Sequence, residues 1–95
     1  MAQSFGGLGR PLGHEQITVG ASAVSIPNLP ADTRRFLIRV VTNSIHWRDD
    51  GIDPDSTHGM PLLTDETLVY DSDPTNFRLI RAGASDADVR IAYYR

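Results

Sequence analysis

The clearest pattern in the chain is an alternation of apolar and polar residues, which predicts β-strands because side chains alternate between the two faces of a strand. The strongest segment is residues 34–42, in which Phe36, Ile38 and Val40 share one face. We expect that face to be buried and the opposite face, with Leu37, to be partly covered. The same alternation predicts strands at residues 16–19, 23–26, 44–48, 66–70, 77–81 and 89–94, with 60–63 as a weaker candidate.

Turn-forming residues separate these segments at intervals of about 8–12 residues, which is typical of a small antiparallel sandwich or barrel. Residues 49–59 are expected to form an irregular loop, because Pro54 follows the Asp-Gly pair too closely for a return strand. One alternative concerns the last segment, where Ser85 and Asp88 have the spacing of a helix capping box. We predict an all-β domain, either a small antiparallel β-sandwich or a barrel-like jelly roll.

The first part of the chain follows a different pattern. Residues 1–13 show no period and contain four glycines, so ordering their backbone is costly. We therefore expect a flexible N-terminal arm at residues 1–13 and a single domain at residues 14–95. The alternative is an arm that becomes ordered when its apolar residues Phe5, Leu8 and Leu12 dock on a neighbouring subunit.

Composition and charge argue against several classes of function. All nine basic residues are arginine, ten of the twelve acidic residues are aspartate, and the net charge is −3. This balance argues against a nucleic-acid-binding protein and against a polybasic membrane anchor. The absence of cysteine excludes disulfides and thiolate chemistry, and no apolar run is long enough to cross a membrane. The first residues lack the pattern of a signal peptide, so a protein that resides or is assembled in the cytoplasm is expected.

Catalytic and metal-binding motifs are weak in this sequence. The loop acids Asp49, Asp50, Asp53 and Asp55, together with His58, are the nearest approach to a calcium or zinc site. Their spacing matches neither type of motif, so solvated turn residues are the better interpretation. There is also no nucleophile elbow, and a chain this small has little room for a pocket beside its core. We expect no enzymatic activity, no cofactor and no metal.

Arginine and aromatic residues are better candidates for contacts with other proteins. Arginine is enriched at interfaces, although ion pairs with nearby aspartates are the expected role of Arg78, Arg81 and Arg90. Trp47 is most simply a core anchor at a strand end, whereas Tyr94 points away from its neighbour Tyr93 and is free to face a partner. The candidate partner-binding residues are Phe5, Leu8, Leu12, Trp47, Arg48 and Tyr94.

A series of short motifs runs from residue 36 to the C-terminus. They are Trp-Arg-Asp-Asp-Gly at 47–51, Gly-Met-Pro-Leu at 59–62, Phe-Arg-Leu-Ile-Arg-Ala at 77–82 and Val-Arg-Ile-Ala-Tyr-Tyr at 89–94. With Pro54 and the Glu-x-Leu-x-Tyr of residues 66–70, this series resembles small structural proteins encoded among the virion genes of tailed bacteriophages. The resemblance covers about 60 of the 95 residues, and its motifs are structural rather than catalytic.

The resemblance implies a β-sandwich subunit of the phage particle, repeated by symmetry and without enzymatic activity. Within that class we expect a capsid decoration (cement) protein that stabilises the head by binding the major capsid shell. The alternatives are a head-to-tail or tail accessory subunit and, outside that class, a small sugar- or calcium-binding β-sandwich module. The expected location is the virion, and the expected partners are the major capsid protein, other virion subunits and further copies of the chain, with a trimer as one option. No direct contact with nucleic acid or a membrane is expected.

Overall fold

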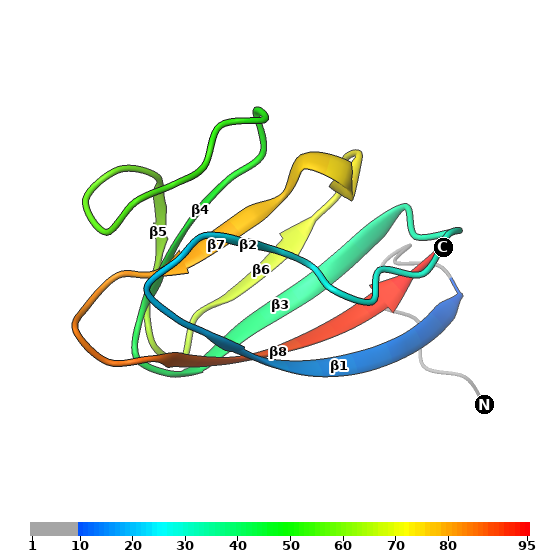
Figure 1. Cartoon of the computed structure of the whole chain (residues 1–95). Helices are drawn as coiled ribbons and strands as arrows, with labels where there is room; N and C mark the ends of the chain where they lie inside the picture. Colours follow the sequence, from blue (N-terminus) through cyan, green and yellow to red (C-terminus); the bar gives the residue numbers. More distant parts are fainter. Residues whose placement is uncertain (1–9) are drawn as a thin grey trace.

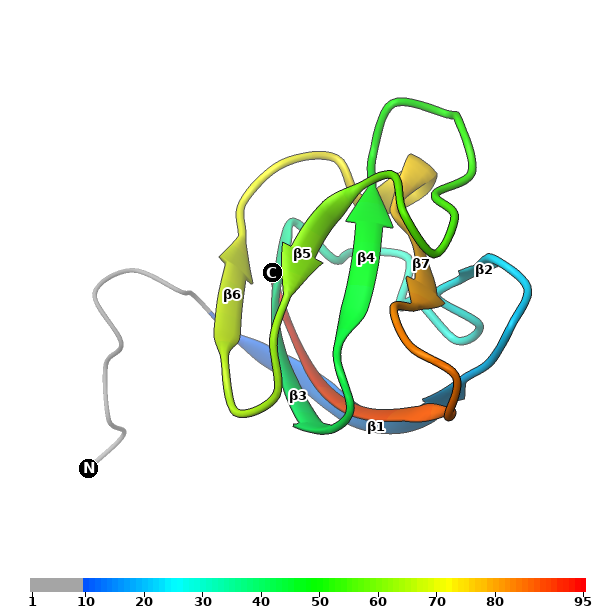
Figure 2. The same ribbon diagram turned by 90° about the vertical axis from the view of Figure 1, so that its left-hand side faces the viewer.

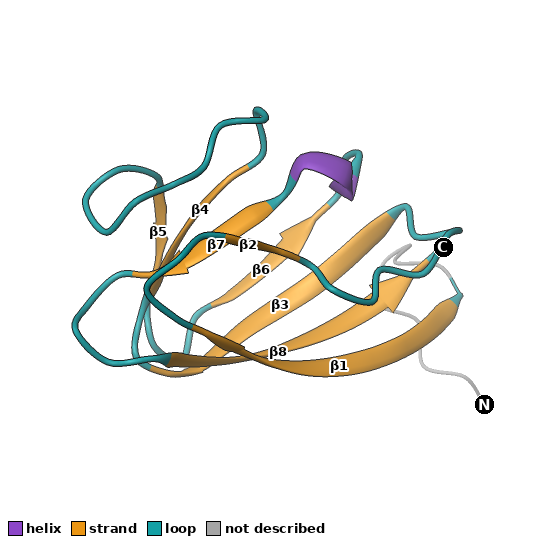
Figure 3. Cartoon of the chain, in the orientation of Figure 1, coloured by secondary structure: helices purple, strands orange, loops and turns teal. Residues whose placement is uncertain are grey.

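Two antiparallel sheets pack face to face in the computed structural model, which describes residues 10–95 (Figure 1). The predicted all-β fold class is therefore confirmed, in the form of a small β-sandwich. The one helical segment among the described residues is the 3-10 turn η1 (Pro74–Asn76), which Asp73 caps (Figure 3). The strands are β1 (Pro11–Val19), β2 (Val24–Ser25), β3 (Arg35–Thr42), β4 (Ile45–Arg48), β5 (Met60–Leu62), β6 (Thr67–Tyr70), β7 (Arg78–Arg81) and β8 (Ala87–Tyr94).

The two sheets have simple antiparallel ladders. The first sheet has the order β1-β8-β3-β6 and the second the order β2-β7-β4-β5. β8 and β3 lie at the centre of the first sheet, and Figure 2 shows β4 and β5 side by side in the second. β1 pairs with β8 along its length, from Pro11 opposite Tyr94 to Val19 opposite Ala87, so the first and last strands of the chain are neighbours.

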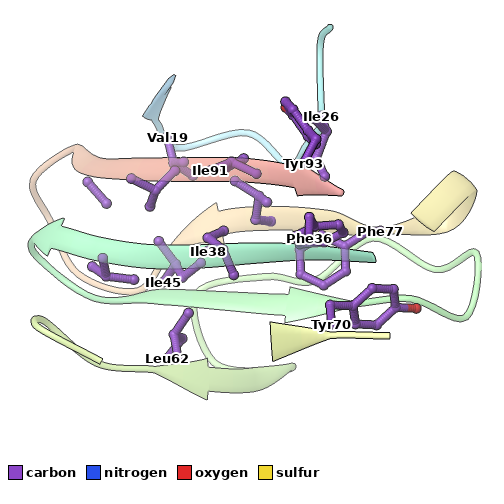
Figure 4. Close-up of a cluster of buried hydrophobic side chains, with 14 residues drawn as sticks. Val19, Ile26, Phe36, Ile38, Ile45, Leu62, Tyr70, Phe77, Ile91 and Tyr93 are labelled. Atoms are coloured by element: carbon purple, nitrogen blue, oxygen red, sulfur yellow. The ribbon is translucent and has the colours of Figure 1, made fainter. Parts of the chain in front are cut away.

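The core lies between the sheets and is built by the alternating apolar residues (Figure 4). On β3, Phe36, Ile38 and Val40 are fully buried while Leu37 on the opposite face is partly buried, as predicted. Each fully buried apolar side chain contributes about 1.5–3 kcal/mol, so this one strand supplies a substantial part of the stability. The other buried hydrophobic residues are Val19, Ile26, Ile45, Leu62, Tyr70, Phe77, Leu79, Ile80, Ala87, Val89, Ile91 and Tyr93.

The first strand begins earlier than the expected boundary between arm and domain. Pro11 already pairs with Tyr94, and the backbone N–H of Arg95 donates to the carbonyl oxygen of Arg10 at 2.9 Å. A register shift between Pro11 and Gly13, where Gly13 has a φ of 149°, lets this glycine-containing start join the ladder. Residues 11–13 of the predicted arm therefore belong to β1, and Phe5 and Leu8 lie outside the described residues.

Two further predictions about single elements can be compared with the structure. The closing segment is the strand β8, paired on both sides, so the helix suggested by the capping-box spacing of Ser85 and Asp88 is wrong. The weaker candidate at residues 60–63 is confirmed as the short edge strand β5. No helix long and apolar enough to cross a membrane occurs in residues 10–95.

Candidate protein-binding surface

Trp47 belongs mainly to an aromatic cluster at one end of the core. Its ring stacks on that of Phe77, with centroids 5.1 Å apart, and meets the edge of Tyr70 at 6.0 Å. The side chain is only partly buried, so the remaining surface of the ring faces a shallow groove that Met60 also lines. The core-anchor interpretation of Trp47 describes most of its contacts.

Arg48 and Leu12 also have partners within the chain. The Arg48 guanidinium donates to both carboxylate oxygens of Asp50, at 3.0 and 2.5 Å. This ion pair raises the pKa of Arg48 and lowers that of Asp50, since each charge stabilises the other. Leu12 is partly buried on β1 and packs against the core. Both side chains are therefore already engaged within the chain, Arg48 in an ion pair and Leu12 in contact with the core.

The other carboxylates of the loop at residues 49–59 are engaged one by one. Asp49 accepts a hydrogen bond of 2.7 Å from the Tyr70 hydroxyl, and Asp53 pairs with Arg78 at 3.1 Å. Asp55 accepts from the backbone of Thr57 and from His58, and these bonds hold its pKa well below the usual range. Each acid points to a different partner, and no group of three or more metal-ligating side chains occurs in residues 10–95.

The stability of the fold is expected to fall at alkaline pH. Burial, followed by the Asp49 carboxylate, raises the pKa of Tyr70 from 10.0 to about 12. Burial and the neighbouring Glu15, which accepts a hydrogen bond from the Tyr93 hydroxyl, raise the pKa of Tyr93 as well. A raised pKa means that the folded state holds the proton more tightly. The stabilisation is therefore complete below pH 10 and is lost as the pH rises towards the folded value.

Urea unfolding followed by circular dichroism measures this effect. The free energy of unfolding should be constant between about pH 7 and 9 and should fall above about pH 10. The Tyr70→Phe variant should be less stable at neutral pH, because it loses the bond to Asp49, but should show a smaller alkaline decrease. Equal stability at pH 7 and pH 11 would contradict the assignment of the two buried hydroxyls.

The outer face of the second sheet is covered by the chain itself. The loop at residues 49–59 folds back over it, so that Pro54 is buried and Gly59 approaches the Cβ atom of His46. Ile80, which the alternation places on the face opposite Leu79, is only 6% exposed because this loop lies over it. The Arg78–Asp53 ion pair holds the loop against the sheet. This face is therefore largely occupied.

The outer face of the first sheet is open. Figures 1 and 2 show no segment of residues 10–95 crossing it. The strand register places an apolar row on this face, with Ala92 next to Leu37 and Leu37 next to Val69, which is 50% exposed. A shallow groove of about 480 Å³ lies over β1, β8 and β3 and includes Leu37 and Ala92 of this row. It is lined by His14, Glu15, Gln16, Leu37, Arg39, Arg90, Ile91 and Ala92.

Two arginines border this groove in an arrangement that the fold does not need. Arg39 on β3 lies directly opposite Arg90 on β8, a cross-strand pair of like charges that is unfavourable in a sheet. Their ion pairs, with Asp65 and Asp88 respectively, are each 3.3 Å long, and Arg39 also donates to the carbonyl oxygen of Asp65 at 3.3 Å. Both side chains are about half exposed (49% and 51%), so these pairs contribute little to stability. Such arginines beside apolar residues are typical of protein-binding surfaces.

The sequence-predicted contact residues do not form one surface. Tyr94 lies on the open face, opposite Arg35, whereas Trp47 packs between the sheets. The ion pairs expected for arginines of the last strands are confirmed, since Arg78, Arg81 and Arg90 each contact an aspartate. Sequence reasoning missed the groove residues Leu37, Arg39, Arg90 and Ala92. The alternation in residues 34–42 places Leu37 and Arg39 on the outer face. The pairing of β3 with β8, which brings all four residues together, could not be predicted from the sequence.

The motif residues behind the resemblance to virion proteins have structural roles. Trp47 packs in the aromatic cluster, while Pro54 and Gly59 fold the loop onto the second sheet. In comparisons with known proteins, no family model and no curated protein matched the chain.

Proposed function

We propose that the protein is a non-enzymatic structural subunit of a tailed-bacteriophage particle, a capsid decoration protein that binds the major capsid shell through the outer face of its first sheet. The observation that carries the proposal is the contrast between the two sheets. Within residues 10–95, a loop covers the outer face of one sheet while the outer face of the other is open, with the Leu37 row and two half-exposed arginines on it. An open sheet face of this kind is suited to a flat protein partner.

The remaining support comes from the chemistry of the side chains and from size. The acids of the loop at residues 49–59 stabilise turns and ion pairs, so their arrangement is explained without a reaction or a ligand. A domain of 95 residues buries a modest fraction of its surface and gains stability by binding a large partner. The proposed partner, the major capsid protein, comes from the resemblance to virion proteins. That resemblance is carried by the motifs at residues 47–51, 59–62, 77–82 and 89–94.

The proposal predicts that Leu37→Asp weakens binding to the shell by at least about tenfold. The substitution places a charge in the middle of the apolar row, where truncation of a central contact typically weakens binding by about tenfold or more. The measurement is cosedimentation of the purified protein with shells assembled from the major capsid protein of the same virus. Ile52→Asp is the matched control, because Ile52 is a hydrophobic residue of similar size, 56% exposed, in the loop over the other sheet.

Both variants should keep the circular dichroism spectrum of the wild type. Because Leu37 is partly buried on a central strand, Leu37→Asp should lower the unfolding midpoint moderately, and binding is therefore compared at a temperature at which both variants are folded. Mass spectrometry of purified particles provides the independent test, and the chain should be present in many copies per particle. A position at the neck or tail would favour the head-to-tail or tail accessory role instead. Absence from the particle, or equal sedimentation of the two variants, would contradict the proposal.

A further inference from the structure

The first sheet ends in an unusually long free edge. β1 has nine residues, whereas the other three edge strands, β6, β2 and β5, have four, two and three. Within residues 10–95 the backbone ladder of β1 is made with β8 alone, so its other side has no strand partner. A long unpaired edge offers a row of N–H and C=O groups to another strand, and natural proteins usually shorten or block such edges.

The devices that normally block an edge are confined to the start of β1 or are otherwise occupied. Pro11 and the register shift lie at its first residues, and from Gly13 to Val19 the ladder is regular. Glu15 points inward, but its carboxylate accepts hydrogen bonds from the Tyr93 hydroxyl and from Asn28, so it belongs to the interior of this chain. The regular stretch therefore leaves a continuous edge available for pairing.

The sequence of this stretch is self-complementary in the antiparallel direction. Its midpoint is Gln16, so pairing with the same strand of a second copy sets Gln16 opposite Gln16. His14 then lies opposite Thr18, and Glu15 opposite Ile17, so no two like charges meet. His14, Gln16 and Thr18 are all exposed on the outer face, where their side chains can adjust to a partner.

We propose that two copies of the chain associate through antiparallel pairing of their β1 strands, with a two-fold axis at Gln16. The contact is isologous and joins the two first sheets into one continuous sheet. The two open faces then lie on the same side of the dimer and form one larger surface, which strengthens binding to a repetitive partner such as a shell. The evidence for this pairing is the free edge of β1 and its register, so the proposal does not depend on the proposed role in a virion.

Cysteine cross-linking tests the register directly, because the natural chain contains no cysteine. Cβ atoms of directly opposite residues in antiparallel strands are close enough for a disulfide with small adjustments. Under mild oxidation Gln16→Cys should form a disulfide-linked dimer at least about tenfold faster than His14→Cys or Thr18→Cys alone, since only paired thiols have a high effective concentration. In an equimolar mixture of His14→Cys and Thr18→Cys about half of the dimers bring the two thiols together, so the mixture should cross-link at about half the rate of Gln16→Cys and much faster than either variant alone.

Analytical ultracentrifugation of the wild type should show a concentration-dependent dimer. Gln16→Lys, which places two ammonium groups at the axis without touching the core, should raise its dissociation constant about fivefold. A wild type that is monomeric at all concentrations, or equal cross-linking rates for the three single cysteine variants, would overturn the proposal. A monomer that still sediments with capsid shells would refute the β1 pairing while leaving the proposed function intact.

Discussion

Replacing Phe77 by alanine should destabilise the fold by about 3–5 kcal/mol, the range found for loss of a fully buried aromatic ring. Phe77 is 0% exposed. Its ring lies 4.9 Å from those of Phe36 and Tyr70 and 5.1 Å from that of Trp47, so its removal leaves a cavity between both sheets. A domain of this size has a total stability of about 5–15 kcal/mol, and the loss therefore takes a large share of it.

The measurement is urea unfolding followed by far-ultraviolet circular dichroism, which reports on the sheets rather than on Trp47. Phe77→Leu is the matched control, since it keeps an apolar side chain at the site and should cost less than the alanine variant. An unfolding midpoint of Phe77→Ala equal to that of the wild type would show that the aromatic cluster does not hold the two sheets together.

Replacing Gly59 by alanine should cost about 1–3 kcal/mol and loosen the loop over the second sheet. Gly59 has a φ of 140°, in a region that residues with a side chain rarely adopt. A Cβ atom there would also lie 3.1 Å from both the His46 Cβ atom and the Trp47 carbonyl oxygen, and 3.2 Å from Pro54 Cβ. The loop must therefore shift, which exposes Ile80 beneath it.

Variants of two other glycines distinguish the two causes of the expected destabilisation, which are backbone strain and close contacts of the added Cβ atom. Gly51 has a φ of 83° but no atom within 4 Å of an added Cβ, so Gly51→Ala should show the cost of backbone strain alone. Gly83 has neither a positive φ nor a close neighbour, and Gly83→Ala should be nearly neutral. Thermal unfolding and hydrogen exchange of the amides in β4 and β7 provide the comparison. A Gly59→Ala variant indistinguishable from Gly83→Ala would mean that the loop is not packed as described.

The strands of the sandwich could be predicted because period-two alternation acts locally. Phe36, Ile38 and Val40 are buried because consecutive side chains of a strand face opposite ways, and no knowledge of the partner strand is needed to see this. The same alternation places Val89 and Ile91 of β8 on one face of the strand, and both are buried. It failed at the start of β1, where the glycine-rich stretch shows no period and pairing with the last strand determines where the strand begins.

The candidate site depended on contacts that the alternation does not contain. Arg39 and Arg90 meet only because β3 pairs with β8, and the register of distant strands is not visible in a single sequence. Ile80 is buried on an outer face because a loop some 25 residues away folds over it, as the Arg78–Asp53 separation shows. The side chain of Tyr94 was correctly predicted to point to the face of β8 opposite that of Tyr93, but its neighbours on the open face could not be predicted.

A cryo-electron microscopy map of a purified particle tests the central claim most directly, because it shows which surface of the sandwich touches the shell. The account predicts density for this chain at repeated positions on the head. The outer face of β3 and β8, with Leu37 and Arg39, should lie against the capsid protein, and the loop at residues 49–59 should be directed away from it. A particle without this density, or one in which the open face of the first sheet is exposed to solvent, would contradict the account.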